Sequence, residues 1–294
     1  MADKIRFSTR IPVRRRTVVL ATLGGALAGA VGVTAAVTVF SPEAGKSTTA
    51  TGPSGKVLYN APARQNTRVP QAATAPQARV DCRKQKCVAL TFDDGPVPDT
   101  TKVLDMLKAK NAKATFFLLG MQVVQYPEIV KRQAAEGHEL GNHTYSHAKL
   151  QGAPAATVLT EINRTQNAIQ QASGKAPILL RPTYGYTDKQ LDGICLQHKL
   201  SEVLWSVDPV DWKDRDSKKI ADRVVTQAQA GGIIILHDVK PTTVAAVPDI
   251  LNKLSQKGFV FVTISEIYGG QLKAGDKYPA FLGSPQAGLA PAGT

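Results

Sequence analysis

The sequence predicts an α/β fold with a parallel sheet, closed or open, because short apolar segments and amphipathic helical segments alternate about seven times along it. Two further observations support this class: glycines follow several of the helical segments, and the polar residues best suited to chemistry follow the strand-like ones. With 294 residues, 43% of them hydrophobic, the chain is long enough for one large domain or two small ones with a buried core.

Each expected strand is a short apolar run, and most are followed by a segment with helical spacing. The strands are expected at Cys87–Phe92, Thr115–Leu119, His138–Asn142, Ile178–Leu180, Val203–Val207, Ile233–Leu236 and Phe259–Thr263. The helices are expected at Pro98–Lys110, Met121–Glu136, Pro154–Ala172, Asp188–His198, Lys218–Ala230 and Thr243–Gln256. Gly137, Gly174, Gly231 and Gly258 provide the stops that helices commonly have at their carboxyl ends.

The N-terminus has the pattern of a membrane or export segment. Six Lys and Arg residues precede an uncharged run of 24 residues, Thr17–Phe40, and about 20 helical residues span a bilayer. Positive charge before such a run predicts that the rest of the chain is exported. We therefore expect residues 1–40 to be a signal anchor or a signal peptide, and Arg15–Arg16 also resembles a twin-arginine signal.

The remaining segments differ sharply in composition and charge. Residues 41–80 contain five prolines among small polar residues and are expected to form a disordered linker, and residues 271–294 a flexible tail. Residues 1–80 carry 11 Lys and Arg against 2 Asp and Glu, whereas the expected domain, residues 81–270, carries 23 against 20. Because the overall charge of +13 lies mostly outside the domain, a nucleic-acid partner is not expected.

The polar residues that could carry chemistry lie just after the expected strands. They are Asp93 and Asp94, His143 and His147, Arg181, Asp208 and Asp211, and His237 and Asp238. In a parallel βα barrel the carboxyl ends of the strands meet at one rim, where active sites are built. The sequence therefore predicts that these side chains gather at a single site.

Three of these residues form a candidate metal site. His143 and His147 are four residues apart, which on a helical turn places both imidazoles on one face. With Asp94 they make a set of three ligands that leaves positions open to water. This set suits Zn²⁺ and can also accept Co²⁺, Mn²⁺ or Fe²⁺.

The neighbouring residues suggest acid–base chemistry. Asp93 can serve as a base, and Arg181 beside it would keep the carboxylate ionised and oriented. His237 can be a general acid if a carboxylate partner fixes its tautomer and charge. The loop after Arg181 could turn a backbone N–H toward an oxyanion, and Trp212 could stack on a sugar ring or line the pocket.

Two of the three cysteines lie five residues apart, where the first expected strand begins. Cys82 and Cys87 could form a small disulfide in an exported protein, which would leave Cys195 as a buried free thiol.

Taken together, these segments resemble the polysaccharide deacetylase family with the NodB homology domain, carbohydrate esterase family 4. The motifs that carry the resemblance appear in order within about residues 85–268. They are Thr91–Gly95, His143–His147, Arg181–Gly185, Asp208–Trp212 and Leu236–Asp238. The chain departs from the family at Thr183, where a second proline is common, and this affects the expected shape of the oxyanion loop.

The resemblance implies a distorted (β/α) barrel of about seven strands and metal-dependent removal of acetyl groups from a glycan. By position, Asp93 would be the base, His237 the acid, and Asp94, His143 and His147 the metal ligands. Arg181 would position the base, and Asp211 would tune His237. Tyr184 would give its backbone N–H to the oxyanion, and Leu236 would line the pocket for the acetyl methyl group.

The expected function is hydrolysis of acetyl groups from an N-acetylated polysaccharide, in particular the N-acetylglucosamine or N-acetylmuramic acid of peptidoglycan. The catalytic domain is expected to be monomeric, in the cell envelope or outside the cell, and attached to a membrane through residues 1–40 if these are not cleaved. The alternatives are a chitooligosaccharide N-deacetylase, an acetylxylan O-deacetylase, and an inactive glycan-binding domain on the same scaffold.

Overall fold

The computed structural model describes residues 80–279. The expected N-terminal segment, residues 41–79 of the expected linker and residues 280–294 of the expected tail lie outside this range. Between residues 80 and 279, no helix is both long enough and apolar enough to cross a membrane.

The centre of the fold is an eight-stranded sheet in which all recorded strand pairs are parallel. Its strands are β1 (Lys86–Asp93), β2 (Thr115–Leu118), β3 (Glu139–Asn142), β4 (Leu179–Leu180), β5 (Ser201–Val203), β6 (Gly232–Leu236), β7 (Phe259–Phe261) and β8 (Lys277–Tyr278). They lie in the order β6-β1-β2-β3-β4-β5-β8, and β7 pairs with the start of β1. This arrangement confirms the predicted α/β class.

The sheet curls into the predicted distorted barrel. After β5 the regular strand pairing stops for a few residues, and Val207 then forms a single parallel bridge with Ile234 of β6. The Ile235 N–H donates to the Val207 carbonyl at 3.1 Å. The expected strand Val203–Val207 is therefore replaced by β5 and a single bridge, which joins the two sides of the sheet.

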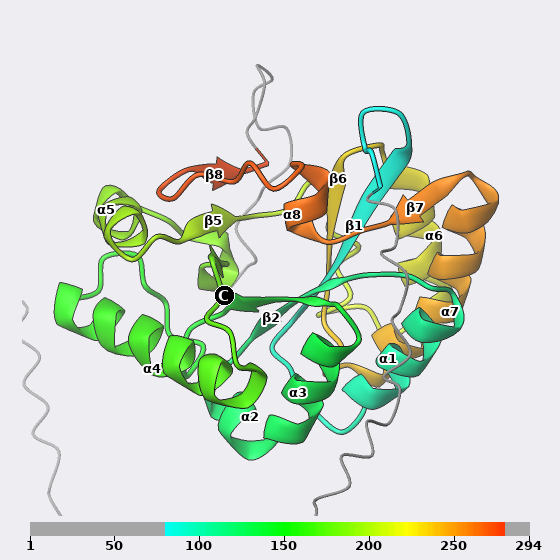
Figure 1. The fold of residues 1–294 in the computed structure, drawn as a ribbon. Helices are drawn as coiled ribbons and strands as arrows, with labels where there is room; N and C mark the ends of the chain where they lie inside the picture. Colours follow the sequence, from blue (N-terminus) through cyan, green and yellow to red (C-terminus); the bar gives the residue numbers. More distant parts are fainter. Residues whose placement is uncertain (1–79, 280–294) are drawn as a thin grey trace, which may run out of the picture. The chain divides into compact units, whose positions relative to one another are not determined.

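Helices surround the sheet, as Figure 1 shows. They are α1 (Thr100–Ala109), α2 (Gly120–Gln125), α3 (Pro127–Ala135), α4 (Ala155–Ser173), α5 (Lys189–Gln197), α6 (Ser217–Gln227), α7 (Pro241–Gln256) and the short α8 (Ile264–Ile267), with a 3₁₀ turn, η1 (Thr183–Gly185). Helix α7 packs against α1 and α6 and contacts β7, and α4 contacts β3 (Figure 1). Each crossover leads the chain back to the end of the sheet at which the strands begin. The carboxyl ends of the strands therefore lie together at the opposite end, on one rim.

The alternation of side chains along the strands separates the barrel interior from the helix-facing core. Ala89, Phe117 and Ile233 pack together inside, whereas Phe92 and Leu236 belong to the larger cluster beneath the helices. Successive residues of a strand point to opposite faces of the sheet. Because Phe92 faces the helices, its neighbour Asp93 faces the interior of the barrel. In β6 the same rule applies to Leu236 and its neighbour Ile235.

The expected single helix Met121–Glu136 is two helices, α2 and α3, separated at Tyr126. Tyr126 has φ −132° and ψ 54°, which is not helical. Pro127 has no N–H for a helical hydrogen bond and disfavours the helical conformation in the residue before it. The proline therefore starts a new helix at its favoured first position.

The sheet extends beyond the expected domain boundary at residue 270. Strand β8 pairs with β5 through Glu202–Lys277 and Val203–Tyr278, within the segment expected to be a flexible tail. The Leu204 N–H also donates to the Tyr278 carbonyl at 2.6 Å. The folded part of the chain thus includes Tyr278, whose ring packs against Tyr268.

The structure contains the disulfide considered from the sequence. Cys82 and Cys87 are bonded, with an S–S distance of 2.07 Å, and this ties the segment before the sheet to the start of β1. Cys195 is a buried free thiol, as expected.

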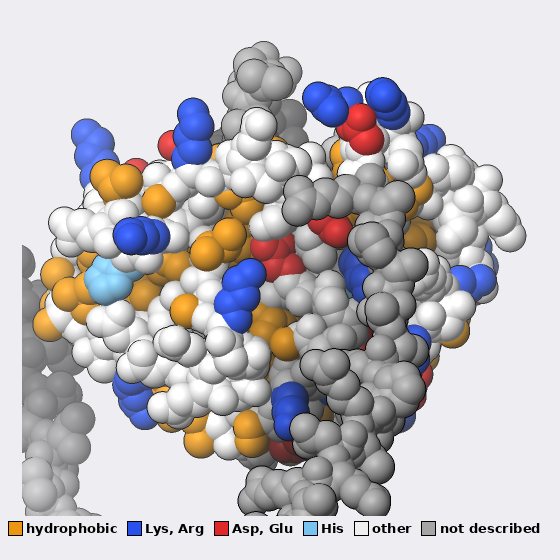
Figure 2. All heavy atoms as spheres, in the orientation of Figure 1, with side chains coloured by type: hydrophobic (Ala, Val, Ile, Leu, Met, Phe, Trp, Pro, Cys, Tyr) orange, Lys and Arg blue, Asp and Glu red, His pale blue; other side chains and the backbone are white. Residues whose placement is uncertain are grey.

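Charged side chains are spread over the face of the molecule that Figure 2 draws. On the face drawn in Figure 2, Lys and Arg side chains of the described residues stand at separate points and form no continuous basic patch. This distribution agrees with the nearly balanced charge of residues 81–270.

Candidate metal and acid–base site

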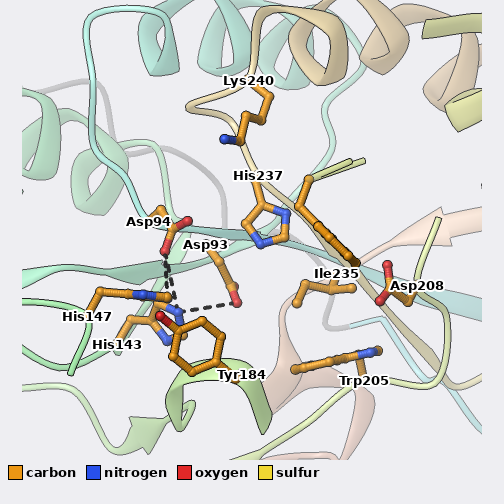
Figure 3. A pocket seen from close by; sticks show the side chains of 11 residues that line it. Asp93, Asp94, His143, His147, Tyr184, Trp205, Asp208, Ile235, His237 and Lys240 are labelled. Atoms are coloured by element: carbon orange, nitrogen blue, oxygen red, sulfur yellow. Dashed lines mark ion pairs between the residues drawn. The ribbon is translucent and has the colours of Figure 1, made fainter. Parts of the chain in front are cut away.

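A pocket with a volume of about 200 Å³ lies at the carboxyl ends of the strands. Its lining side chains come from five separate parts of the chain, and Figure 3 shows them pointing toward a common space. They belong to Asp93, Asp94, His143, His147, Tyr184, Trp205, Asp208, Trp212, Ile235, His237 and Lys240. The predicted convergence of the motifs on one rim is therefore observed.

The pocket contains a cluster with the chemistry of a metal site. One ligand atom each from Asp94, His143 and His147 lie within 4.8 Å of one another. The Nε2 atoms of His143 and His147 are 3.5 Å and 3.4 Å from Asp94 Oδ1. Asp94 Oδ1 is buried and has no hydrogen-bond partner within residues 80–279. Two imidazoles and a carboxylate with a free buried oxygen fit a divalent ion with open coordination positions.

The two histidines are not on a helical turn, and this part of the expectation is wrong. Residues 143–147 form a loop in which Thr144 and His147 have φ values of 69° and 62°. Such left-handed conformations cost about 1–3 kcal/mol for residues other than glycine and persist when their surroundings enforce them. Here Glu161 of α4 accepts the N–H groups of Tyr145 and Ser146, each at 2.8 Å. A carboxylate from the neighbouring helix thus holds the loop.

His143 is prepared to bind a metal through Nε2. Its Nδ1 lies 2.8 Å from the Arg181 carbonyl, which accepts a hydrogen bond from the Nδ1–H tautomer and leaves the Nε2 lone pair free. Burial disfavours the imidazolium and lowers the pKa of His143 to about 3, against an opposing effect of Asp94. The ring is therefore neutral at physiological pH, as a metal ligand must be.

Asp93 lies beside this cluster and is held by a buried arginine. Arg181 Nη1 is 2.7 Å from Asp93 Oδ1 and also 2.7 Å from Thr91 Oγ1. The Nε and Nη2 groups of Arg181 donate to the carbonyls of Val203 and Leu204 at 3.1 and 3.0 Å. The other carboxylate oxygen, Asp93 Oδ2, lies 3.7 Å from His143 Nε2 on the side of the cluster.

The electrostatic balance at Asp93 differs from the expectation based on Arg181 alone. Burial raises the pKa of Asp93, and the charges of Arg181 and His237 offset only part of this effect. A carboxylate with a raised pKa is a stronger proton acceptor than an ordinary aspartate. Arg181 therefore fixes the orientation of a base whose proton affinity is set mainly by burial.

His237 is paired with Asp211. Its Nδ1 lies 2.8 Å from Asp211 Oδ1, and its backbone N–H donates to Asp211 Oδ2 at 2.7 Å. The buried Thr243 of α7 donates to the same Oδ2 at 2.7 Å. Burial alone would lower the pKa of His237, but the hydrogen bond and charge of Asp211, with Asp93 and Asp94, raise it to about 9. His237 is therefore protonated at neutral pH, with Nε2 left for the pocket.

Tyr184 lies on the opposite side of the cluster, in η1. Its φ of 60° is left-handed, and its ring stands edge-on to that of His147, with centroids 4.8 Å apart. Thr183, the position where the family often has proline, donates its hydroxyl to the Ala148 carbonyl at 2.7 Å. A proline cannot make this bond, so in this chain a threonine ties the Tyr184 loop to the loop that carries His147.

Residues far along the chain support the same loop from behind. Thr187 Oγ1 lies 2.7 Å from Glu202 Oε2 and 3.2 Å from Asp192 Oδ1. Lys277 of β8 in turn forms an ion pair with Asp192 at 2.7 Å. The last strand, which the sequence did not predict, therefore contributes to the support of the Tyr184 loop.

The expected apolar wall is formed by a different residue. Leu236 is completely buried in the core beneath the helices, whereas Ile235 lines the pocket. Strand alternation explains the difference, because Ile235 and His237 share the inward face. Trp212 lines the pocket and is 38% exposed, and Tyr184 is 45% exposed. Trp205 and Lys240 were not singled out from the sequence, since neither lies in a motif with recognisable spacing.

The comparisons with known proteins agree with this geometry. The family model for polysaccharide deacetylase matches residues 81–203. The peptidoglycan-N-acetylmuramic acid deacetylase PdaC of Bacillus subtilis is 46% identical over 184 residues, which is 62% of this chain and 39% of that protein. A peptidoglycan-N-acetylglucosamine deacetylase of Bacillus cereus is 37% identical over 216 residues, which is 69% of this chain and 78% of that protein. This chain thus spans about two fifths of the length of the Bacillus subtilis relative.

Solved structures show the same fold. The structure of the T48 deacetylase with substrate has a TM-score of 0.65 and 40% identity, and the match covers 68% of this chain and 99% of that one. A family 4 acetyl xylan esterase from Clostridium thermocellum in complex with a cobalt ion has a TM-score of 0.59 and 34% identity. That match covers 63% of this chain and 91% of the esterase.

Proposed function

Because this chain belongs to the polysaccharide deacetylase family, we propose that it removes acetyl groups from the N-acetylated sugars of peptidoglycan by metal-dependent hydrolysis. The observation that carries the proposal is the convergence of the Asp94–His143–His147 cluster, a buried carboxylate and a protonated imidazole on one pocket. Relatives named as peptidoglycan deacetylases support the substrate.

The metal is proposed to be zinc, with cobalt, manganese or iron able to replace it. Two imidazoles and one carboxylate are a common ligand set for catalytic zinc. When bound by Asp94, His143 and His147, the ion would polarise the acetyl carbonyl and lower the pKa of water at the site.

The residues of the chain then divide the proton transfers between two sides of the pocket. Asp93 Oδ2 accepts the proton of the attacking water while Arg181 holds Oδ1 in place. The backbone N–H of Tyr184 donates to the oxygen that gains negative charge, an interaction typically worth about 3 kcal/mol. His237 donates its Nε2 proton to the leaving nitrogen, because an amine anion is a poor leaving group. The oxygen of the water bonds to the acetyl carbon, the amide C–N bond breaks, and acetate and a free amino sugar leave.

The pH profile tests the role of Asp211. We expect kcat/KM of the wild type to fall as pH rises through about 9, where His237 loses its proton. Asp211→Asn removes the charge that raises this pKa, so the alkaline limb should move to lower pH. Acetate release measured between about pH 6 and pH 10 gives the profile. Asp249→Asn, which changes an exposed carboxylate of α7 outside the pocket, is the control. An unchanged alkaline limb in Asp211→Asn would contradict the assignment.

A second candidate substrate is acetylated xylan, because the cobalt-bound relative is named as an acetyl xylan esterase. An inactive glycan-binding domain is disfavoured because ligands, base and acid are all present in the pocket. Location in the cell envelope follows from a peptidoglycan substrate. Membrane attachment through residues 1–40 and a monomeric state stay predictions.

The proposed function is tested by acetate release from peptidoglycan, chitooligosaccharides and acetylated xylan by the full chain, with and without chelator. Release from peptidoglycan that stops with chelator and returns with zinc is the expected result. Release only from xylan would favour the second candidate. A metal-loaded chain that binds glycan but releases no acetate from any substrate would identify a glycan-binding protein.

A further inference from the structure

Most charged groups of the pocket have a partner or a place in the metal cluster, and the carboxylate of Asp208 accepts the Val210 N–H at 2.7 Å. Asp93 is paired with Arg181 and Asp211 with His237, at 2.7 and 2.8 Å. Asp94 belongs to the metal cluster. Lys240 is different: it lines the pocket, but its amino group has no carboxylate within 4.0 Å and no hydrogen bond within residues 80–279.

The position of Lys240 is fixed relative to His237. Its backbone N–H donates to the His237 carbonyl at 3.0 Å, and its own carbonyl accepts the Val244 N–H at 3.0 Å. Lys240 is thus held in a tight turn between the acid and helix α7. In Figure 3 its side chain lies above His237, on the side of the pocket away from Tyr184 and Trp205. Lys240 is half-buried and lines the pocket in which a substrate would bind.

The surroundings of Lys240 favour an anion. Lys240 is the N-cap of the 16-residue helix α7, whose first turn contains no acidic residue. The positive end of the helix dipole therefore adds to the charge of the lysine. No proton transfer of the proposed reaction needs this cation, because Arg181 holds the base and His237 is itself protonated. Lys240 adds a further positive charge to a pocket that contains a metal site and an imidazolium. Such a charge is stabilised most by a substrate that is itself negatively charged.

Peptidoglycan has two acetylated sugars that differ in this respect. N-acetylmuramic acid carries a lactyl ether on the carbon next to its acetamido group, and N-acetylglucosamine has a neutral hydroxyl there. The lactyl group ends in a carboxylate or, where a stem peptide is attached, leads to the carboxylates of that peptide. When the acetamido group is at the metal cluster, this substituent is the nearest source of negative charge.

We propose that Lys240 binds a carboxylate of the muramyl substituent, and that the enzyme therefore prefers N-acetylmuramyl units to N-acetylglucosamine. The proposal rests on the proposed function and names the sugar on which that function acts. An ammonium–carboxylate hydrogen bond at a partly exposed site gives a preference of up to about fivefold, mainly through KM. Raised salt weakens the preference, because the lysine is not fully buried.

The test compares three substrates with matched variants of the full chain. The substrates are chitopentaose, glycan strands freed of stem peptides, and strands that keep their peptides. Lys240→Met removes the charge at similar length, Lys240→Arg keeps it, and Lys213→Met changes an exposed lysine outside the pocket. Released acetate gives kcat and KM, and mass spectrometry identifies the deacetylated sugar.

The expected result is that Lys240→Met lowers the ratio of kcat/KM for muramyl strands over chitopentaose by up to about fivefold. Lys240→Arg and Lys213→Met should keep the wild-type ratio. Loss confined to peptide-free strands assigns the contact to the lactyl carboxylate, and loss confined to peptide-bearing strands assigns it to the peptide. An unchanged ratio in Lys240→Met on both kinds of strand overturns the proposal, as does an equal loss on all three substrates.

Binding separates this proposal from the proposed function. Calorimetric titration of Asp93→Asn protein with muramyl and glucosaminyl tetrasaccharides, with and without Lys240→Met, requires no turnover. Weaker muramyl binding in the Lys240→Met protein supports the carboxylate contact even if no acetate is released by the wild type. Equal affinity for the two sugars, or the absence of binding, overturns the contact. Wild-type turnover with an unchanged ratio refutes only the role of Lys240.

Discussion

Asp93→Asn is expected to lower kcat for acetate release by about 10²–10⁴-fold while one metal ion stays bound per chain. The amide of asparagine keeps the shape of the side chain but cannot accept the proton of the attacking water. The metal ligands Asp94, His143 and His147 are unchanged, so metal content measured by mass spectrometry should equal that of the wild type. Single-turnover acetate release gives the rate of the chemical step.

The variant also leaves Arg181 without its anion in a fully buried position. Removal of one partner of a buried pair costs about 3–5 kcal/mol, so the midpoint of urea unfolding should fall. Rates are therefore compared where both proteins are folded, as judged by circular dichroism. Substantial turnover by folded Asp93→Asn would show that another group is the base.

His147→Ala is expected to lower metal affinity by more than about a hundredfold, because loss of a residue that only orients a ligand already costs 10–100-fold. His147 is the suitable variant since its side chain is 29% exposed, whereas that of His143 is buried. Truncation at His147 thus removes a ligand without a large cavity in the core. Metal per chain after dialysis, together with acetate release, measures the effect.

His198→Ala is the matched control, because His198 lies at the end of α5, outside the pocket. It should keep both metal and activity. Retention of one ion per chain by His147→Ala after dialysis would remove His147 from the ligand set. Added zinc should restore activity to the wild type after treatment with chelator, but not to His147→Ala at the same free concentration.

Much of the fold follows from local patterns in the sequence. The alternation of strand and helix segments predicts the parallel sheet, and six of the eight strands lie close to their expected positions. The break between α2 and α3 can also be predicted from the sequence, because Pro127 interrupts an otherwise continuous helical pattern. Strand β8 cannot be predicted from the sequence, because its two residues follow a glycine-rich segment and show no periodic pattern. They form a strand only through their pairing with β5.

The site divides in the same way. The sequence predicts one site from the spacing of the motifs and from the position of polar residues after strands. The structure places the side chains of Asp93, Asp94, His143, His147 and His237 around one pocket. The predicted apolar wall was misplaced by one residue, because the choice between Ile235 and Leu236 depends on which face of β6 points inward. That choice is set by the whole barrel and cannot be read from a continuous apolar run.

The sequence by itself determined which reacting groups this protein has and that each one follows a strand, because residue type and strand pattern are local properties. Only the tertiary structure decided how those groups meet. The left-handed residues His147 and Tyr184 lie in loops that are held by contacts with Glu161 and with the Ala148 carbonyl. The pKa values of Asp93 and His237 depend on burial and on partners elsewhere in the chain. Such contacts arise when the barrel closes, so no single segment contains them.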